Sequence, residues 1–205
     1  MLAALAKQGG AVLTTAEKST LQQAMFPGGH LSPAITAQSV RKICTIAGLT
    51  RPGLADARCL LVEESGTGPA HPFSGEKLSP VLTLYRANDF DHAFNILRDI
   101  YSYMGNGHSC GIYSENDTHI RRLGLEMTVC RVIVKQAHTF ATGGGFDNGL
   151  PFSLSMGCGT WGGNSFSENL HYKHFLNITR IVRTIPAREP SPDDIFGAYR
   201  KKYDA

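Results

Sequence analysis

Residues 81–134 decide the fold, and they read VLTLYRANDFDHAFNILRDIYSYMGNGHSCGIYSENDTHIRRLGLEMTVCRVIV. Short apolar runs that favour strands alternate here with helical patterns, the first of which we expect to be capped by Asn88. The expected strands cover 81–86, 109–113 and 129–134, and the expected helices cover 88–104 and 116–127. Strands and helices that alternate with short connections are typical of crossovers onto a parallel sheet. The sequence therefore predicts an α/β fold with a βαβ core.

The flanking sequence extends this pattern in both directions. Thr14 and Glu17 have the spacing of a capping box, and Gly48 is placed to end a later helix. Upstream we expect helices at 2–8, 15–26 and 38–47 and strands at 11–14 and 59–63. Downstream we expect a loop over 136–170, a strand over 177–185 and a helix that opens at Ser191.

Composition excludes several classes of protein. The 205 residues are 42% hydrophobic and 18% charged, with a formal net charge of +3, so no basic surface for nucleic acid or an anionic membrane is expected. Five cysteines without a CxxC pair argue against a disulfide framework or a structural zinc site. No apolar run is long enough to span a membrane, and the start lacks a signal peptide pattern, so we expect a cytoplasmic protein.

The segment 143–169 is unusually rich in glycine. It reads GGGFDNGLPFSLSMGCGTWGGNSFSEN and holds eight glycines and the only tryptophan. Each glycine costs backbone entropy on ordering, so this density indicates tight turns or a close approach of the main chain to another group. A functional site and a plain surface loop both fit the composition.

Three side chains that do not lie in the middle of a helix or strand are candidates for a catalytic or binding role. Glu76, just before an expected strand, can accept two hydrogen bonds from a vicinal diol such as a nucleotide ribose, but from the residues alone a solvated glutamate paired with a lysine is favoured. Cys158 lies between glycines but has no histidine in its own segment to form a thiolate, so burial as a small residue is favoured. We interpret His108 as a capping or core histidine, and no pattern of metal ligands or phosphate-binding glycines is present.

Several motifs together resemble one family. The chain carries GEKLSPVL at 75–82, GHSCGIY at 107–113, GLEMTVCRVIV at 124–134 and LSMGCGTWGGNSFSENL at 154–170, followed by HYKHFLNITRI. In this order and spacing they resemble the C-terminal portion of CoA-acylating aldehyde dehydrogenases over essentially all residues. The likeness is greatest to the group of sulfoacetaldehyde dehydrogenases (acylating).

The resemblance implies a reaction and a set of site residues. In that family a cysteine thiolate attacks an aldehyde, hydride passes to NAD or NADP, and coenzyme A captures the acyl group. The resemblance implies that Glu76 holds the ribose hydroxyls and that Leu78 packs near the nicotinamide. It places near the substrate Phe140, Phe146, Gly159, Thr160 and Trp161. The family's nucleophile lies N-terminal to the matched region, so no catalytic residue is assigned here and the chain alone is expected to be inactive.

The same resemblance implies how the chain is organised. Residues 1–176 would be part of the catalytic domain, and 177–205 an oligomerisation strand and a C-terminal helix, with the strand Asn177–Ile185 joining a second copy. Two alternatives stay open: a truncated, non-catalytic interaction module, and a hydrolytic aldehyde dehydrogenase, whose family more often has phenylalanine where Leu78 stands. Half a domain would also expose apolar faces of its sheet.

Overall fold

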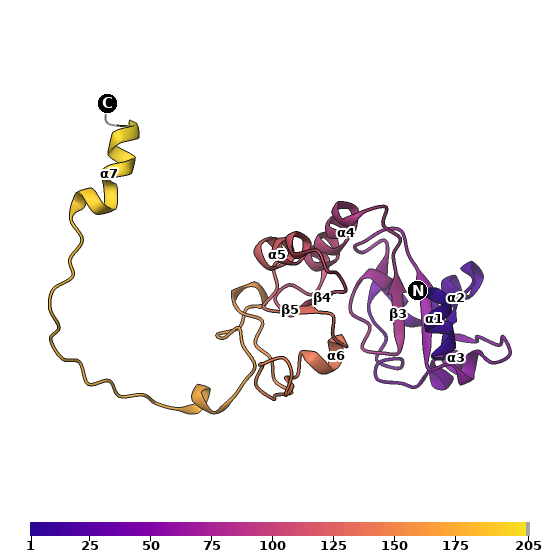
Figure 1. The fold of residues 1–205 in the computed structure, drawn as a ribbon. Coiled ribbons are helices and arrows are strands. Elements are labelled where there is room, and N and C mark those ends of the chain that lie inside the picture. Colours follow the sequence, from indigo (N-terminus) through magenta and orange to yellow (C-terminus); the bar gives the residue numbers. More distant parts are fainter. Residues whose placement is uncertain (204–205) are drawn as a thin grey trace. The chain divides into compact units, whose positions relative to one another are not determined.

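The computed structural model describes residues 1–203 and has two compact units, Met1–His171 and Tyr172–Ala205 (Figure 1). All strands lie in the first unit and pair in parallel, which confirms the predicted α/β class. The first sheet has the order β1-β2-β3 and the second the order β4-β5. The strands are β1 Gly10–Val12, β2 Cys59–Glu63, β3 Val81–Leu84, β4 Cys110–Ile112 and β5 Val132–Val134.

The two sheets differ from the single sheet predicted for 81–134. β3 pairs with β2 in the register Leu60↔Val81, and β4 pairs with β5 in the register Cys110↔Val132. No ladder joins β3 to β4 in residues 1–203. The reason lies in the packing, because each sheet has its own helices and its own apolar cluster.

The helices follow the predicted order. They are α1 Leu2–Lys7, α2 Thr15–Met25, α3 Val40–Ala47, α4 Phe90–Tyr103, α5 Asp117–Glu126, α6 His138–Ala141 and α7 Pro192–Tyr203. Short 3-10 turns occur at Pro27–Gly29, Leu54–Asp56, Pro72–Ser74, Thr160–Gly162 and Tyr172–Phe175. The short α6 lies inside the predicted loop 136–170 and was not expected. Among residues 1–203, no helix has the length and apolar content needed to cross a lipid bilayer.

Local capping signals explain where the helices begin. The predicted capping box is confirmed, because Thr14 N–H donates to Glu17 Oε2 over 2.8 Å and Glu17 N–H donates to Thr14 Oγ1 over 3.3 Å. The predicted cap at Asn88 is wrong. Asp89 caps α4 instead, accepting from His92 N–H over 2.7 Å, and its carboxylate also suits the positive end of the helix dipole.

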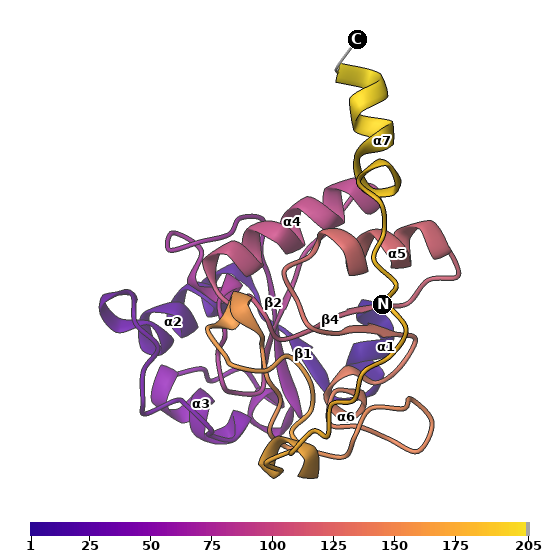
Figure 2. The same cartoon turned by 90° about the vertical axis from the view of Figure 1, so that its left-hand side faces the viewer.

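Two apolar clusters hold the first unit together. The first cluster packs α2 and α3 against β2 and β3 and includes the fully buried Leu21, Ile43, Leu60 and Phe73. The second lies beneath α4 and α5, which run side by side (Figure 2), and consists of Phe94, Cys110, Leu123, Met127 and Val129. Strand residues outside these clusters are less covered: Leu82 is 45% exposed and Val12 36% exposed. The first sheet therefore shows apolar side chains to solvent, as expected for a partial domain.

The second unit departs from the prediction at one segment. Residues 177–185 form no strand in the single chain, and the strand expected to join a second copy stays a prediction. Their apolar side chains, such as Ile181 at 84% and Val182 at 88%, are exposed. A strand requires backbone partners, and this unit supplies none within the described residues. The helix predicted from Ser191 is confirmed, because Ser191 Oγ accepts from Asp194 N–H over 3.2 Å at the start of α7.

Candidate functional site

Hydrogen bonds from Lys77 fix the loop that carries Glu76. Lys77 Nζ donates to the carbonyl oxygens of Phe73 and Gly75, both over 2.8 Å. Burial lowers the pKa of Lys77 from its usual 10.5 to about 8, and the nearby Glu76 carboxylate opposes that effect. The Glu76 side chain is exposed and makes no hydrogen bond or ion pair within residues 1–203. A fixed loop thus presents a carboxylate whose acceptor sites are free.

Leu78 follows directly in a conformation that is rare for its type. Its φ is 44°, in the left-handed region, and its side chain is 55% exposed. The Leu78 carbonyl accepts from Ala37 N–H over 2.8 Å, which fixes the backbone there. The strain is held by the surrounding structure, a situation that is common at binding sites.

The glycine-rich turn 157–164 closes on itself through hydrogen bonds and borders a cavity. Asn164 Oδ1 accepts from Cys158 N–H over 2.8 Å, and Asn164 N–H donates to Gly159 O over 2.8 Å. A cavity of about 280 Å³ opens beside it. It is lined by three residues that the family resemblance assigns to substrate, Gly159, Thr160 and Trp161, together with Asn164, Ser165, Phe166 and Ser167.

The Glu76 loop and the turn 157–164 both pack on one short stretch, Tyr103–Gly107, between α4 and β4. A Cβ added at Gly75 would lie 2.6 Å from Met104 Sδ and 3.2 Å from Tyr103 Cε1. A Cβ added at Gly107 would lie 2.4 Å from Cys158 O. Glycine is needed at Gly107, where the close neighbour is backbone, whereas at Gly75 the side chains of Met104 and Tyr103 would have to move. Two segments that are about eighty residues apart in sequence are thereby brought to neighbouring positions.

The two phenylalanines predicted near the substrate lie away from this cavity, Phe140 on α6 and Phe146 in the glycine-rich segment. Phe140 is 83% exposed and Phe146 is 100% exposed, and neither lines the cavity beside Trp161. Phe146 packs edge-on against Phe152, with ring centroids 4.9 Å apart. The structure thus gathers Gly159, Thr160 and Trp161 but not these two rings.

A chain of three side chains at the start of β4 was missed from the sequence. His108 Nδ1 lies 2.6 Å from Ser109 Oγ, which lies 2.9 Å from His138 Nε2. Ser109 is buried, and His138, on α6, has its pKa lowered by burial and by His108. His108 itself is exposed, so its interpretation as a core histidine is wrong. Only the pair His108-Ser109 was visible locally, because His138 is 29 residues from Ser109.

Cys158 packs rather than pairing with a base. A Cβ added at Gly162 would lie 2.3 Å from Cys158 Cβ, so the thiol side chain fills space inside the turn. All five cysteines are free thiols. This arrangement fits the packing role favoured from the sequence.

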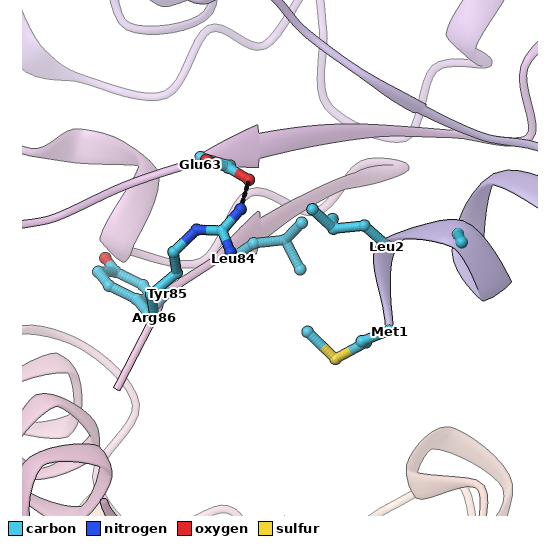
Figure 3. A pocket seen from close by; sticks show the side chains of 7 residues that line it. Met1, Leu2, Glu63, Leu84, Tyr85 and Arg86 are labelled. Atoms are coloured by element: carbon cyan, nitrogen blue, oxygen red, sulfur yellow. Dashed lines mark hydrogen bonds and ion pairs between the residues drawn. The ribbon is translucent and has the colours of Figure 1, made fainter. Parts of the chain in front are cut away.

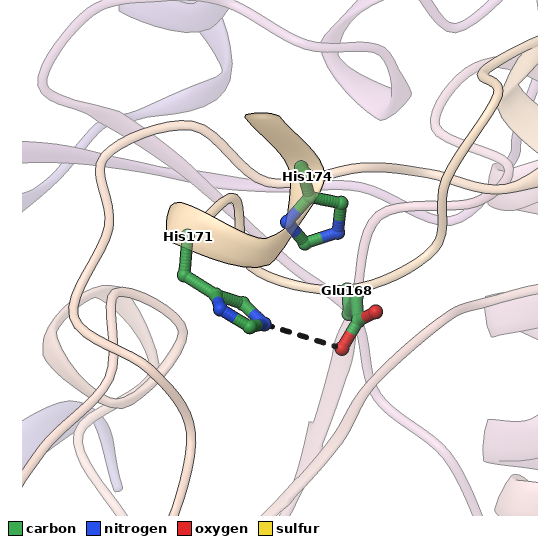
Figure 4. A group of neighbouring side chains, drawn as sticks. All are labelled: Glu168, His171 and His174. Atoms are coloured by element: carbon green, nitrogen blue, oxygen red, sulfur yellow. Dashed lines mark ion pairs between the residues drawn. The ribbon is translucent and has the colours of Figure 1, made fainter. Parts of the chain in front are cut away.

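A second cavity and a histidine–glutamate pair also lie in the first unit. A cavity of about 350 Å³ lies at the carboxyl ends of β2 and β3, where Arg86 Nη2 is 2.7 Å from Glu63 Oε1 (Figure 3). Glu76 precedes the amino end of β3 and does not line that cavity. Elsewhere, His171 Nε2 lies 3.8 Å from Glu168 Oε2, a loose pair near the end of the first unit (Figure 4).

Comparison with known proteins reveals several relatives. No family model matches the chain. A sulfoacetaldehyde dehydrogenase (acylating) from Cupriavidus necator is 55% identical over 97% of this chain. A protein of the same name from Bilophila wadsworthia is 36% identical over 98%. A probable aldehyde dehydrogenase from Listeria monocytogenes, 36% identical, superposes with a TM-score of 0.82 over 95% of this chain. Over nearly all of its length, this chain is similar to part of an acylating aldehyde dehydrogenase.

The chain spans only part of a typical acylating aldehyde dehydrogenase. It covers 40% of the Cupriavidus relative and 42% of the Listeria structure. An acetylating aldehyde dehydrogenase from Geobacillus thermoglucosidasius, 30% identical with a TM-score of 0.78, matches 91% of this chain through 41% of its own length. The resemblance inferred from the motifs is confirmed at the level of the family, and the roles of individual residues stay predictions.

Proposed function

We propose that this chain forms the ribose-binding and aldehyde-binding part of an NAD(P)-dependent, CoA-acylating aldehyde dehydrogenase. The observation that carries this proposal is the convergence of the Glu76 loop and the turn 157–164 on Tyr103–Gly107. A hydride acceptor and its aldehyde must lie side by side, and these are the two segments that the family resemblance assigns to them. We propose sulfoacetaldehyde as the first substrate to test, because two relatives bear that name.

The residues present fit the role of holding a nucleotide. The Glu76 carboxylate is exposed and unpaired within residues 1–203, and Lys77 fixes the loop on both sides of it. A carboxylate accepts two hydrogen bonds from the vicinal hydroxyls of a ribose, and such charge-assisted bonds are short and strong. When bound, NAD(P)+ supplies the hydride acceptor, and coenzyme A as co-substrate takes the acyl group. The exposed Leu78 side chain would pack against the nicotinamide.

The aldehyde end of the site is provided by the turn 157–164 and its surroundings. The cavity beside Trp161 would admit a small aldehyde, and Thr160 and Asn164 offer polar atoms at its wall. We place Phe140 and Phe146 further out, where their exposed rings are available to a partner surface. The attacking cysteine would come from outside these 205 residues, since none of the five cysteines matches the family's nucleophile.

The chain by itself presents an open half of such a site. Glu76 lines neither the cavity beside Trp161 nor the one beside Glu63 and Arg86. A dinucleotide groove would then need a second wall from the remainder of a family-length protein, whose relatives are about 2.5 times longer. We therefore propose that catalysis requires that remainder, and that the isolated chain does not turn over substrate.

Activity can be tested on two polypeptides. We expect CoA-dependent formation of NAD(P)H from sulfoacetaldehyde by the longest in-frame polypeptide that carries this sequence, and none by the 205-residue chain. Succinate semialdehyde and acetaldehyde complete the panel. Absence of aldehyde-dependent reduction in the longer polypeptide contradicts the proposal, and reduction without CoA points to the hydrolytic alternative.

Substitution of Glu76 tests the ribose contact. Glu76→Gln removes the charge but keeps the size, and loss of a charge-assisted hydrogen bond costs about 1.5–3 kcal/mol, or roughly 10- to 150-fold in kcat/KM for the cofactor. The exposed Glu189 offers a matched control as Glu189→Gln. Equal cofactor kinetics in the two variants would remove Glu76 from the site.

A second candidate function follows from residues 177–185. Their exposed Ile181 and Val182 and their unpaired backbone suit a strand that is completed by another copy, so we propose that Asn177–Ile185 joins subunits into a homo-oligomer. If the longer polypeptide has no activity but associates through this segment, the non-catalytic interaction module becomes the better account. Sedimentation of wild type and Ile181→Lys distinguishes the outcomes.

A further inference from the structure

Two buried polar side chains form a hydrogen-bonded node behind the turn 157–164. Arg131 is 6% exposed and Asn169 is fully buried. Arg131 Nε donates to Asn169 Oδ1 over 2.9 Å, which links residues that are 38 positions apart. We define these two residues as the Arg131–Asn169 node.

The node reaches four separate stretches of main chain. Arg131 Nη1 donates to His108 O over 3.2 Å and to Gly157 O over 3.0 Å. Asn169 Nδ2 donates to Thr142 O and to Pro151 O, both over 2.9 Å. The start of β4, the end of α6, the stretch at Pro151 and the first residue of the turn 157–164 are therefore fixed to the same pair of side chains.

Burial of the Arg131 guanidinium costs free energy, and a need to fill space in the core does not explain why a charged side chain is present. Arg131 Nη2 is buried and makes no hydrogen bond in the described chain, and Arg131 has no carboxylate partner there. A buried charge without a counter-charge is unfavourable, and apolar residues of similar size are often at least as stabilising. The planar guanidinium of Arg131 does, however, donate to several carbonyl groups in fixed directions.

We propose that Arg131 and Asn169 are positioning residues that hold the turn 157–164 against His108, and so set the geometry of the aldehyde cavity. This role rests on the proposed function of that cavity. Neither side chain lines the cavity, so both act through Gly157 and the backbone that follows it.

The node is independent of the cofactor end of the site. The Glu76 loop is held by Lys77 through Phe73 O and Gly75 O, and no hydrogen bond joins that loop to Arg131 or Asn169 within residues 1–203. Damage to the node should therefore affect the aldehyde and leave the NAD(P)+ contact intact. A residue that merely stabilised the fold would affect both.

Two conservative variants test the node in the longest polypeptide that carries this sequence. Asn169→Asp keeps the acceptor for Arg131 but removes both donations from Nδ2, and Arg131→Lys keeps the charge but removes the planar guanidinium. The matched controls are Asn95→Asp and Arg98→Lys, which lie on the exposed side of α4. We expect kcat/KM for the aldehyde to fall at least about tenfold in the node variants, with the KM for NAD(P)+ within about twofold of wild type.

Amide hydrogen exchange on the same proteins separates the possible outcomes. We expect faster exchange over 151–168 in the node variants and unchanged exchange over 59–84. Aldehyde kinetics within about twofold of the controls, or exchange that is faster over both regions in both variants, would overturn the proposal. If wild type lacks activity, the proposed function fails. Amide exchange alone then tests the positioning role of Arg131 and Asn169, and an unchanged exchange rate over 151–168 in the node variants overturns that role.

Discussion

Gly107 offers a direct test of how the turn 157–164 is seated, through the substitution Gly107→Ala. The residue has φ 97°, and an added Cβ would lie 2.4 Å from Cys158 O, 2.7 Å from Cys158 Cβ and 2.8 Å from Gly162 N. These neighbours are mainly backbone atoms, which cannot rotate away as a flexible side chain would. Alanine at this position must therefore move the turn.

The size of the effect follows from these distances. Ordinary contact begins near 3.4 Å, so the Cys158 carbonyl must retreat by about 1 Å, the difference between 3.4 and 2.4 Å. Left-handed backbone costs alanine about 1–2 kcal/mol, and overpacking costs about 1–3 kcal/mol. We expect a loss of about 2–5 kcal/mol in the free energy of unfolding. If the turn borders the aldehyde as proposed, a shift of that size also lowers kcat/KM for the aldehyde by about 100-fold.

The assay compares this variant with Gly124→Ala in urea unfolding and in aldehyde kinetics. Gly124 lies on α5, and a Cβ there meets no atom within 4 Å, so alanine should be neutral or stabilising by up to about 1 kcal/mol. If Gly107→Ala unfolds at the same urea concentration as Gly124→Ala and keeps wild-type kinetics, the turn is not packed on Gly107 as described.

Two further substitutions test the Glu76 loop and its surroundings. Lys77→Met removes the ionisable group. The pKa of Lys77 is about 8 in the folded protein and 10.5 in its ordinary, solvent-exposed state. Between these two pH values the unfolded chain therefore binds more protons than the folded chain. Wild type should therefore gain stability relative to Lys77→Met as pH rises from about 8 to 10.5, and parallel unfolding curves across that range would refute the shift. In Gly66→Ala the new Cβ would lie 2.3 Å from His71 Nε2, displacing the imidazole that lies 3.0 Å from Glu64 Oε1. We expect a loss of about 1 kcal/mol in urea unfolding, and stability equal to that of Gly124→Ala would show that the ring is not held there.

The sequence was most informative where the signal is local. The Thr14–Glu17 box, the stop at Gly48 and the bounds of β2 follow from residues within one turn or one strand of each other. The same locality explains the error at α4, where Asn88 and Asp89 are both good caps and only the register of the helix decides between them. Elements with strong local signals were therefore predictable, whereas the first residue of α4 was not.

Long-range pairings were not predictable. Nothing in the sequence marks Asn169 as the partner of Arg131, because the two are 38 residues apart and each looks like an ordinary surface residue. The break between β3 and β4 is of the same kind, since hydrophobic periodicity predicts strands but not which strands pair. The strand expected at 177–185 does not form in the single chain for a related reason: its backbone partners do not lie in the described chain.

The glycine-rich segment shows why composition could not separate a mobile loop from a site. A Cβ added at Gly157 would lie 2.2 Å from Phe166 O, and one at Gly162 would lie 2.3 Å from Cys158 Cβ. Glycine is required at these places because two stretches of backbone meet there, not because the chain needs freedom to move. A mobile loop and a close-packed turn have the same glycine content, but only the packed turn places backbone groups at fixed directions around a cavity. The turn 157–164 is of the second kind, and the proposal that it shapes an aldehyde site depends on this packing.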